Sequence, residues 1–142
     1  MNKTIAIRYY SKTGHTKKLA KVLSDYFNIE ALTINEPLTT PTDLLFLGGA
    51  CYGATLSKEM MAFIKTLNPQ VINNIIIFTS ACKLNPYQLF VEELQKNNLN
   101  VAKEYFYCKG SFLIMNINHP NQDDLVELKK FASKISNTLL KD

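Results

Sequence analysis

The residues whose types and spacing best suit chemistry form a short, hydroxyl-rich segment near the start of the chain. Ser11, Thr13 and Thr16 surround Gly14, after the apolar run 5–7 and where a helical pattern begins. A helix N-terminus carries unpaired amide N–H groups and about half a positive charge. A strand that ends in such a loop therefore suits a phosphate dianion, which amides and hydroxyls can bind together.

Two nucleotide-binding motifs are absent from this segment, and one structural alternative remains. The Gly-Lys-Ser/Thr of the Walker motif does not occur, and the dinucleotide fingerprint G-x-G-x-x-G is missing as well. The alternative is an ordinary N-capped helix in which Ser11 or Thr13 supplies the cap. From these residues alone, both interpretations stay open.

The composition is ordinary for a globular protein. The chain has 142 residues, of which 46% are hydrophobic and 20% charged, which suits one domain, 1–142, with a sizeable core. No apolar run reaches the length of a membrane span, and the first residues become polar too soon for a signal peptide. We therefore expect a cytoplasmic protein. Three cysteines without C-x-x-C spacing and two histidines favour neither a disulfide framework nor a metal site.

The net charge of +4 includes a local excess of lysine close to the hydroxyl-rich segment, at Lys12, Lys17, Lys18 and Lys21. These lysines can help to hold a phosphate, or they can form a solvated helix face. Basic and aromatic residues do not alternate in the way that indicates nucleic-acid binding, so we expect no nucleic-acid partner.

Strand and helix patterns alternate along the chain. Apolar and β-branched runs predict five strands, at residues 3–9, 28–34, 43–49, 74–79 and 101–108, with a possible continuation of the last one at 112–117. Helical spacing predicts helices at residues 14–27, 58–67, 86–97 and 121–140. This alternation predicts an α/β doubly wound parallel sheet with right-handed crossovers. Ligands bind such sheets outside the carboxyl ends of the strands.

Two more loops fall at that predicted edge of the sheet. The loop after the third strand reads Ala50, Cys51, Tyr52, Gly53, Ala54 and Thr55. The fourth strand runs into Ser80, Ala81, Cys82 and Lys83. The first loop reads Ser11, Lys12, Thr13, Gly14, His15 and Thr16, and it resembles the S-x-T-G-N-T phosphate loop of flavodoxins. His15 replaces asparagine at a position that contributes mostly backbone. Across nearly all residues, the element order and length also resemble a short-chain flavodoxin.

The resemblance implies a flavodoxin-like three-layer sandwich that binds one FMN non-covalently on a five-stranded parallel sheet of order 2-1-3-4-5. The phosphate would lie on residues 11–16 and the isoalloxazine between loops 50–55 and 80–83. Tyr52 can stack on a flavin, or it can be a half-buried surface tyrosine. Gly53–Ala54 corresponds to the peptide that flips in flavodoxins when flavin N5 gains a proton, although Gly53 can also be an ordinary turn glycine.

The function that the resemblance implies is one-electron transfer between redox enzymes, with a reductase and an electron acceptor as partners and no catalytic residue. We expect a monomer. The first alternative is an FMN-dependent reductase or oxidase on the same fold, because segment 49–53 also resembles flavodoxin-type protoporphyrinogen oxidases. The second alternative is a flavin-free interaction module.

Three features depart from the flavodoxin pattern. Ala54 stands where many flavodoxins carry an acidic residue. The loop after the fourth strand, residues 82–87, lacks the Gly-Asp pair and the aromatic residue that flavodoxins usually have there. Tyr87 can supply that aromatic, or it can begin the helix after Pro86. The sequence pI near 8.9 also contrasts with the acidic character common in flavodoxins.

Two further features of the sequence concern the cysteines and one buried arginine. Three cysteines fall at the carboxyl ends of neighbouring predicted strands, namely Cys51, Cys82 and Cys108. They can be thiols that face the flavin, or they can be small buried apolar residues. Arg8 interrupts the first strand; its role stays open at this point, and a buried pairing with a carboxylate such as Asp43 is one option.

Overall fold

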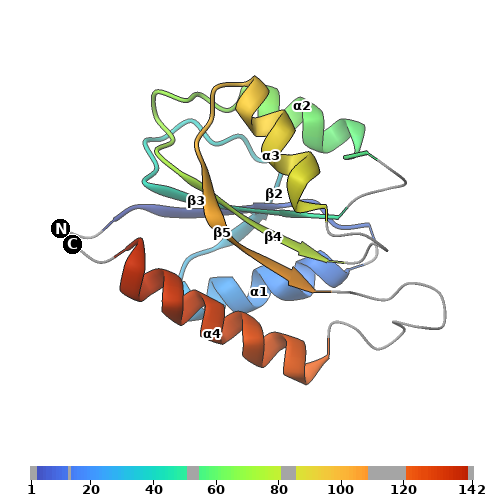
Figure 1. Ribbon diagram of the computed structural model, residues 1–142, viewed down its shortest axis with the longest axis vertical. Coiled ribbons are helices and arrows are strands. Elements are labelled where there is room, and N and C mark those ends of the chain that lie inside the picture. Colours follow the sequence, from blue (N-terminus) through green and yellow to red (C-terminus); the bar gives the residue numbers. More distant parts are fainter. Residues whose placement is uncertain (1–2, 13, 51–54, 81–85, 109–120, 141–142) are drawn as a thin grey trace.

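A parallel five-stranded sheet lies between two pairs of helices (Figure 1). The computed structural model describes residues 3–12, 14–50, 55–80, 86–108 and 121–140. The strands are β1 (Ile5–Tyr9), β2 (Ala31–Thr33), β3 (Leu44–Gly49), β4 (Ile75–Ser80) and β5 (Val101–Cys108). Their order is β2-β1-β3-β4-β5, and every neighbouring pair is parallel. The sheet order 2-1-3-4-5 expected from the sequence is therefore confirmed.

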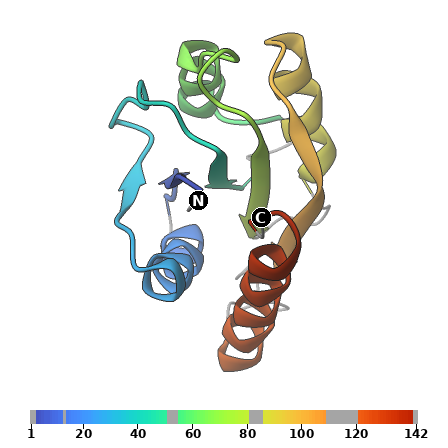
Figure 2. The same cartoon turned by 90° about the vertical axis from the view of Figure 1, so that its left-hand side faces the viewer.

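The helices cover both faces of the sheet in pairs, which Figure 2 shows from the side. They are α1 (His15–Phe27), α2 (Lys58–Thr66), α3 (Tyr87–Lys96) and α4 (Gln122–Thr138). One hydrophobic cluster joins α1 and α4 to the sheet and contains Ile7, Phe46, Ile76 and Phe78. The other joins α2 and α3 and contains Leu45, Leu47, Ile75 and Ile77. Since side chains alternate between the faces of a strand, the continuous apolar runs of β3 and β4 supply both clusters.

Close packing between β3 and β4 explains one glycine. A Cβ atom on Gly48 would lie 2.2 Å from ring atoms of Phe78. The Phe78 ring, which is fully buried, therefore occupies the space that any other residue would fill at position 48. Replacing Gly48 would force this ring, and the cluster under α1 and α4, to move.

The ends of the elements differ from the sequence expectations at the edge strand. The run 28–34 was expected to be a strand, but β2 begins only at Ala31. Asn28 takes a left-handed conformation, with φ of 56°, and its amide N–H donates a hydrogen bond to Ser24 O. Asn28 therefore still belongs to the C-terminal cap of α1. The expected continuation of β5 at 112–117 lies outside the described residues.

The pairing of Arg8 with Asp43, one option from the sequence, is wrong. Arg8 is 7% exposed, and its guanidinium donates to the carbonyl oxygens of Glu36 (3.0 Å), Pro37 (3.1 Å) and Ile7 (3.1 Å). Asp43 instead accepts from the Thr4 amide at 2.7 Å. The segment after β2 is irregular, so its carbonyls lack partners in the sheet and the planar guanidinium satisfies them. Burial lowers the pKa of Arg8, and the nearby Glu36 and Glu30 partly offset that effect.

No helix within the described part of the chain is both long and apolar enough to cross a membrane.

Candidate functional site

The described part of the carboxyl edge brings together residues from three of the predicted loops. Ser11, Lys12, Gly14, His15 and Thr16 follow β1, Ala50 follows β3, and Ser80 ends β4. Thr55 is exposed shortly before α2. The remaining candidates lie outside the described residues, so their roles stay predictions: Thr13, Cys51, Tyr52, Gly53, Ala54, Ala81, Cys82 and Lys83.

A buried pair of hydroxyls joins two of these loops. The Oγ1 atom of Thr16, in the first turn of α1, lies 2.8 Å from the Oγ atom of Ser80 at the end of β4. Thr16 is 2% exposed and Ser80 is 1% exposed. Each hydroxyl carries one proton and can accept from others, and a single proton joins the pair. The second proton can therefore be donated to an acceptor at the same edge.

Among the described residues, the start of α1 lacks a side-chain cap, as the start of α3 does, whereas α2 and α4 each have one. Ser57 caps α2 through the Met60 amide (3.1 Å), and Asn121 forms a reciprocal capping box with Asp124 on α4. By contrast, the N-cap of α1 is Gly14, with φ of 93°, and no side chain caps the described first turn. The amides of a first helical turn have no intrahelical acceptor. At α1 they therefore suit an acceptor from outside the helix.

The predicted cap residue Ser11 has a different role. Its Oγ accepts from the Gly14 amide at 3.0 Å, which closes the turn before the helix without capping the helix itself. The interpretation of Ser11 as the N-cap is therefore wrong, and Thr13 lies outside the described residues. Apart from its chain neighbours, a Cβ on Gly14 would meet no atom of the described residues within 4 Å, so the left-handed backbone is what favours glycine here.

The charges around this helix start favour an anion. The first turn of α1 contains no acidic residue, and Lys12, Lys17 and Lys18 are exposed around it. Burial, and then the charge of Lys18, lowers the pKa of His15, which keeps the imidazole neutral at physiological pH. First-turn amides, a spare hydroxyl proton and nearby lysines form a donor set without a carboxylate. This set fits the phosphate group that the flavodoxin resemblance implies.

Tyr87 does not serve this edge as the second aromatic. It begins α3 directly after the N-cap Pro86, and its hydroxyl donates to Ala102 O at 2.8 Å. Its ring stacks on Tyr105 with centroids 4.0 Å apart and an interplanar angle of 17°. The interpretation of Tyr87 as the start of a helix is confirmed, and the flavin-stacking one is wrong because β5 holds the ring. Burial, followed by the neighbouring Tyr105 and Glu104, raises the pKa of Tyr87.

Sequence reasoning missed two contacts at this edge. One is the Thr16–Ser80 pair, for which the only signal was a hydroxyl residue at the end of an otherwise apolar strand. The other is the Tyr10 hydroxyl, which donates to Glu59 Oε2 at 3.2 Å and so links the loop after β1 to the first turn of α2. Burial and this carboxylate raise the pKa of Tyr10.

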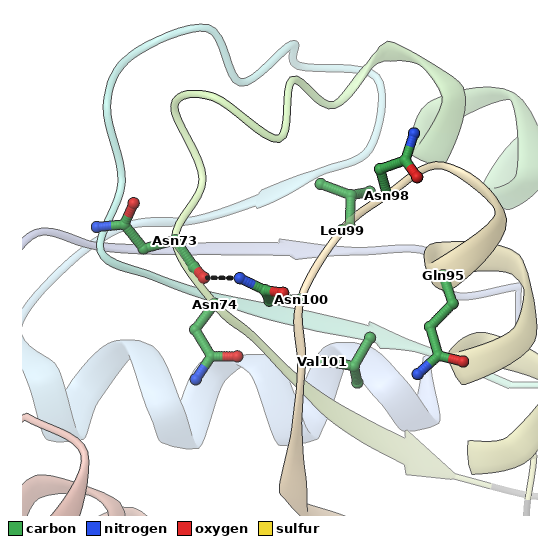
Figure 3. A pocket seen from close by; sticks show the side chains of 7 residues that line it. All are labelled: Asn73, Asn74, Gln95, Asn98, Leu99, Asn100 and Val101. Atoms are coloured by element: carbon green, nitrogen blue, oxygen red, sulfur yellow. Dashed lines mark hydrogen bonds between the residues drawn. The ribbon is translucent and has the colours of Figure 1, made fainter.

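A hollow of about 580 Å³ lies at the opposite, amino edge of β4 and β5, and Figure 3 shows its side chains. Five of the seven lining residues are carboxamides, namely Asn73, Asn74, Gln95, Asn98 and Asn100. Asn74 Oδ1 accepts from the Ile75 amide, and Asn100 Nδ2 donates to Asn73 O. These two hydrogen bonds lie in the segments that precede β4 and β5, so Asn74 and Asn100 have a structural role there. Ligands of open α/β sheets bind at the other edge.

Comparisons with known proteins agree with this architecture. No model of a protein family matches the chain. An uncharacterized protein of Methanocaldococcus jannaschii is 26% identical over an alignment of 147 residue positions, which covers 92% of this chain and 97% of that protein. The strand order and the helix pairs are those of a flavodoxin-like fold.

Solved structures of flavin proteins share this fold at low sequence identity. A flavodoxin from the domain Archaea superposes with a TM-score of 0.73 at 16% identity, covering 96% of this chain and 98% of that one. An NADH:FMN oxidoreductase in its apo form gives 0.71 at 12% identity, with coverage of 99% and 91%. A flavoprotein of Lactobacillus acidophilus in complex with FMN gives 0.60 at 15% identity, with coverage of 74% and 92%.

Proposed function

We propose that this protein binds FMN at the carboxyl edge of its sheet and carries electrons between a reductase and an acceptor protein, as flavodoxins do. The observation that carries the proposal is the uncapped, acid-free start of α1 beside the buried Thr16–Ser80 pair. The fold shared with a flavodoxin, and with a flavoprotein in complex with FMN, supports the same cofactor. We also propose that the partners are cytoplasmic redox enzymes.

The chain's own residues would bind and orient the cofactor. The first-turn amides of α1 would bind the phosphate, and the hydroxyl of Thr16 would donate the spare proton of its pair with Ser80 to a phosphate oxygen. The exposed lysines of α1 would add long-range attraction that salt weakens. When bound, FMN supplies the one-electron chemistry, and the protein supplies position and electrostatics.

An FMN-dependent reductase is the second candidate function. The similarity to an NADH:FMN oxidoreductase, with a TM-score of 0.71, favours it. Against it, the sequence contains no evident nicotinamide-binding motif. The two candidates differ in whether the protein alone turns over a reduced nicotinamide.

The test is anaerobic, stepwise reduction of FMN-loaded protein, followed by an assay with NADH or NADPH and a quinone. An electron carrier takes up electrons from the chemical reductant or from an added flavodoxin reductase, but it does not oxidise the nicotinamide at a steady rate by itself. Sustained nicotinamide oxidation without a reductase would overturn the carrier role in favour of the enzyme. A protein that binds no FMN would overturn both candidates.

A further inference from the structure

A second pocket begins beside the proposed flavin edge, at Gly14, and runs along the side of α1 that faces the edge strand β2. Its volume is about 440 Å³, within the range of about 300–1,000 Å³ that is typical of small-molecule sites. It extends from Gly14 at the start of α1 to Ser24, about 15 Å further along the helix at about 1.5 Å per residue. Figure 2 shows α1 and β2 side by side at the left of the molecule. We call this pocket the α1–β2 groove.

Four of the nine described residues that line the groove are small. Gly14 is the N-cap of α1, Ala20 and Ser24 belong to α1, and Ala31 belongs to β2. Ala31 keeps part of its surface exposed, and Ala20 is fully buried in the core cluster, so the floor of the groove is apolar. β2 is only three residues long and ends the sheet, and so no further strand covers this side within the described residues.

The rim of the α1–β2 groove is cationic. Lys17, Lys18 and Lys21 line it, and Glu30 is the acidic residue among its described lining. Lys21 makes an exposed ion pair with Asp25 at 3.5 Å, whereas no carboxylate of the described residues forms an ion pair with Lys17 or Lys18. Lysine side chains extend apolar methylenes along such a surface and keep the ammonium groups in water. The rim therefore attracts anions, and the floor favours apolar atoms.

We infer that the α1–β2 groove is a binding site for a small organic anion with an apolar body, such as an aryl sulfonate or a medium-chain carboxylate. The apolar floor would bury the body, and the lysines would hold the anionic group at the rim. A bare inorganic anion would leave the floor in water and gain little. The groove begins at Gly14, beside the proposed phosphate site, and runs along α1 towards Ser24, and the inference does not depend on the protein binding FMN.

The first experiment uses 8-anilinonaphthalene-1-sulfonate (ANS) as the probe, because it combines one sulfonate with an aromatic body. Fluorescence titration is carried out on the full chain with and without saturating FMN, and decanoate and inorganic phosphate serve as competitors. We expect one saturable ANS site that remains when FMN is present, that decanoate displaces, and that phosphate at equal concentration does not. Loss of ANS binding on adding FMN, or equal displacement by phosphate, would overturn the inference.

The second experiment compares three variants. Lys21→Glu reverses one rim charge and should weaken ANS binding by about fivefold, a typical scale for an exposed charge contact. Ala31→Leu fills the floor and should weaken ANS binding at least as much. Lys134→Glu makes the same charge change on the exposed face of α4, away from the groove, and should leave ANS binding unchanged.

Two results would contradict the proposed site. If Lys21→Glu and Lys134→Glu weaken ANS binding equally, the positive charge of the protein attracts ANS in general and no specific site binds it. ANS binding that neither groove substitution weakens would place the probe elsewhere. Circular dichroism checks the fold of each variant, and the Lys21→Glu comparison still decides the question if Ala31→Leu fails to fold. A protein that binds ANS in the groove but no FMN would contradict the proposed flavin function alone.

Discussion

The hydroxyl of Thr16 lies 2.8 Å from the hydroxyl of Ser80, although the two residues are 64 positions apart in the chain. This buried contact fixes the first turn of α1 to the carboxyl end of β4. The proposed phosphate site belongs to α1, and the loop after β4 is one of the two that would enclose the flavin ring. A change at either hydroxyl should therefore affect both the fold and the binding of a phosphorylated ligand.

The first prediction concerns the stability of the free protein. Thr16→Val keeps the shape of the side chain but leaves the buried Ser80 hydroxyl without its partner. We expect a loss of about 1–3 kcal/mol in the free energy of unfolding, the cost of a buried unsatisfied polar group. The double variant Thr16→Val/Ser80→Ala should lose less than the sum of the single variants, because no orphaned hydroxyl remains. Urea unfolding of all four proteins measures this coupling, and strictly additive losses would contradict the contact.

The second prediction concerns the phosphate of the ligand. A hydroxyl that donates to a charged phosphate contributes about 1.5–3 kcal/mol, so Thr16→Val should weaken FMN binding by roughly 10- to 150-fold. Riboflavin, which lacks the phosphate, should lose much less affinity. Thr16→Ser, which keeps the hydroxyl, is the matched control. If FMN and riboflavin lose affinity equally in calorimetry, Thr16 acts on the fold and does not donate to the phosphate.

The third prediction concerns the backbone at the start of α1. Gly14 has φ of 93°, a region that costs an L-residue roughly 1–2 kcal/mol. Gly14→Ala should lower stability by about that amount, even though its Cβ would meet no atom within 4 Å in the described part of the chain beyond its neighbours in sequence. Gly14→Asn should lower it less, because asparagine tolerates the left-handed region better. Thermal or urea unfolding measures the order of stability of the wild type, Gly14→Asn and Gly14→Ala. An Ala variant as stable as the wild type would contradict the strained backbone.

The fourth prediction concerns His15 and pH. Burial and Lys18 lower the pKa of His15 in the folded protein, so the folded chain binds this proton less readily than the unfolded chain. The stability that His15 contributes is therefore complete above the ordinary histidine pKa and is lost as the pH falls below it. In an NMR titration, the His15 midpoint should lie below that of an unstructured histidine peptide. FMN should move it upward, because a phosphate dianion favours the imidazolium. A midpoint that FMN does not change would place the phosphate away from His15.

The sheet could be predicted from the sequence because its central strands have an unambiguous pattern. Residues 44–49 and 75–80 are buried on both faces, and their continuous apolar runs are typical of parallel strands between two helix layers. The edge strand β2 was less predictable, because residues 28–30, which the apolar pattern assigns to the strand, form the C-terminal cap of α1 and the turn after it. Helix caps depend on backbone conformation, which the residue types indicate only in part.

A candidate site could be proposed from the sequence, but its contacts could not. The residue types of 11–16 indicate a loop that suits phosphate, whereas the Thr16–Ser80 pair joins residues that no local pattern relates. Arg8 shows the same limit, because its acceptors are carbonyls that an irregular segment leaves unpaired and not the side chain of Asp43. Tyr87 shows it again, since only the fold reveals that Tyr105 and Ala102 O hold its ring and hydroxyl.

The measurement that tests the central claim most directly is a calorimetric titration of the wild-type protein with FMN and, separately, with riboflavin. The account predicts one FMN site per chain and an affinity for FMN that exceeds the affinity for riboflavin by about 100-fold or more, since several bonds to a charged phosphate contribute about 1.5–3 kcal/mol each. No binding of FMN, or equal affinities for FMN and riboflavin, would contradict a flavin phosphate held at the start of α1.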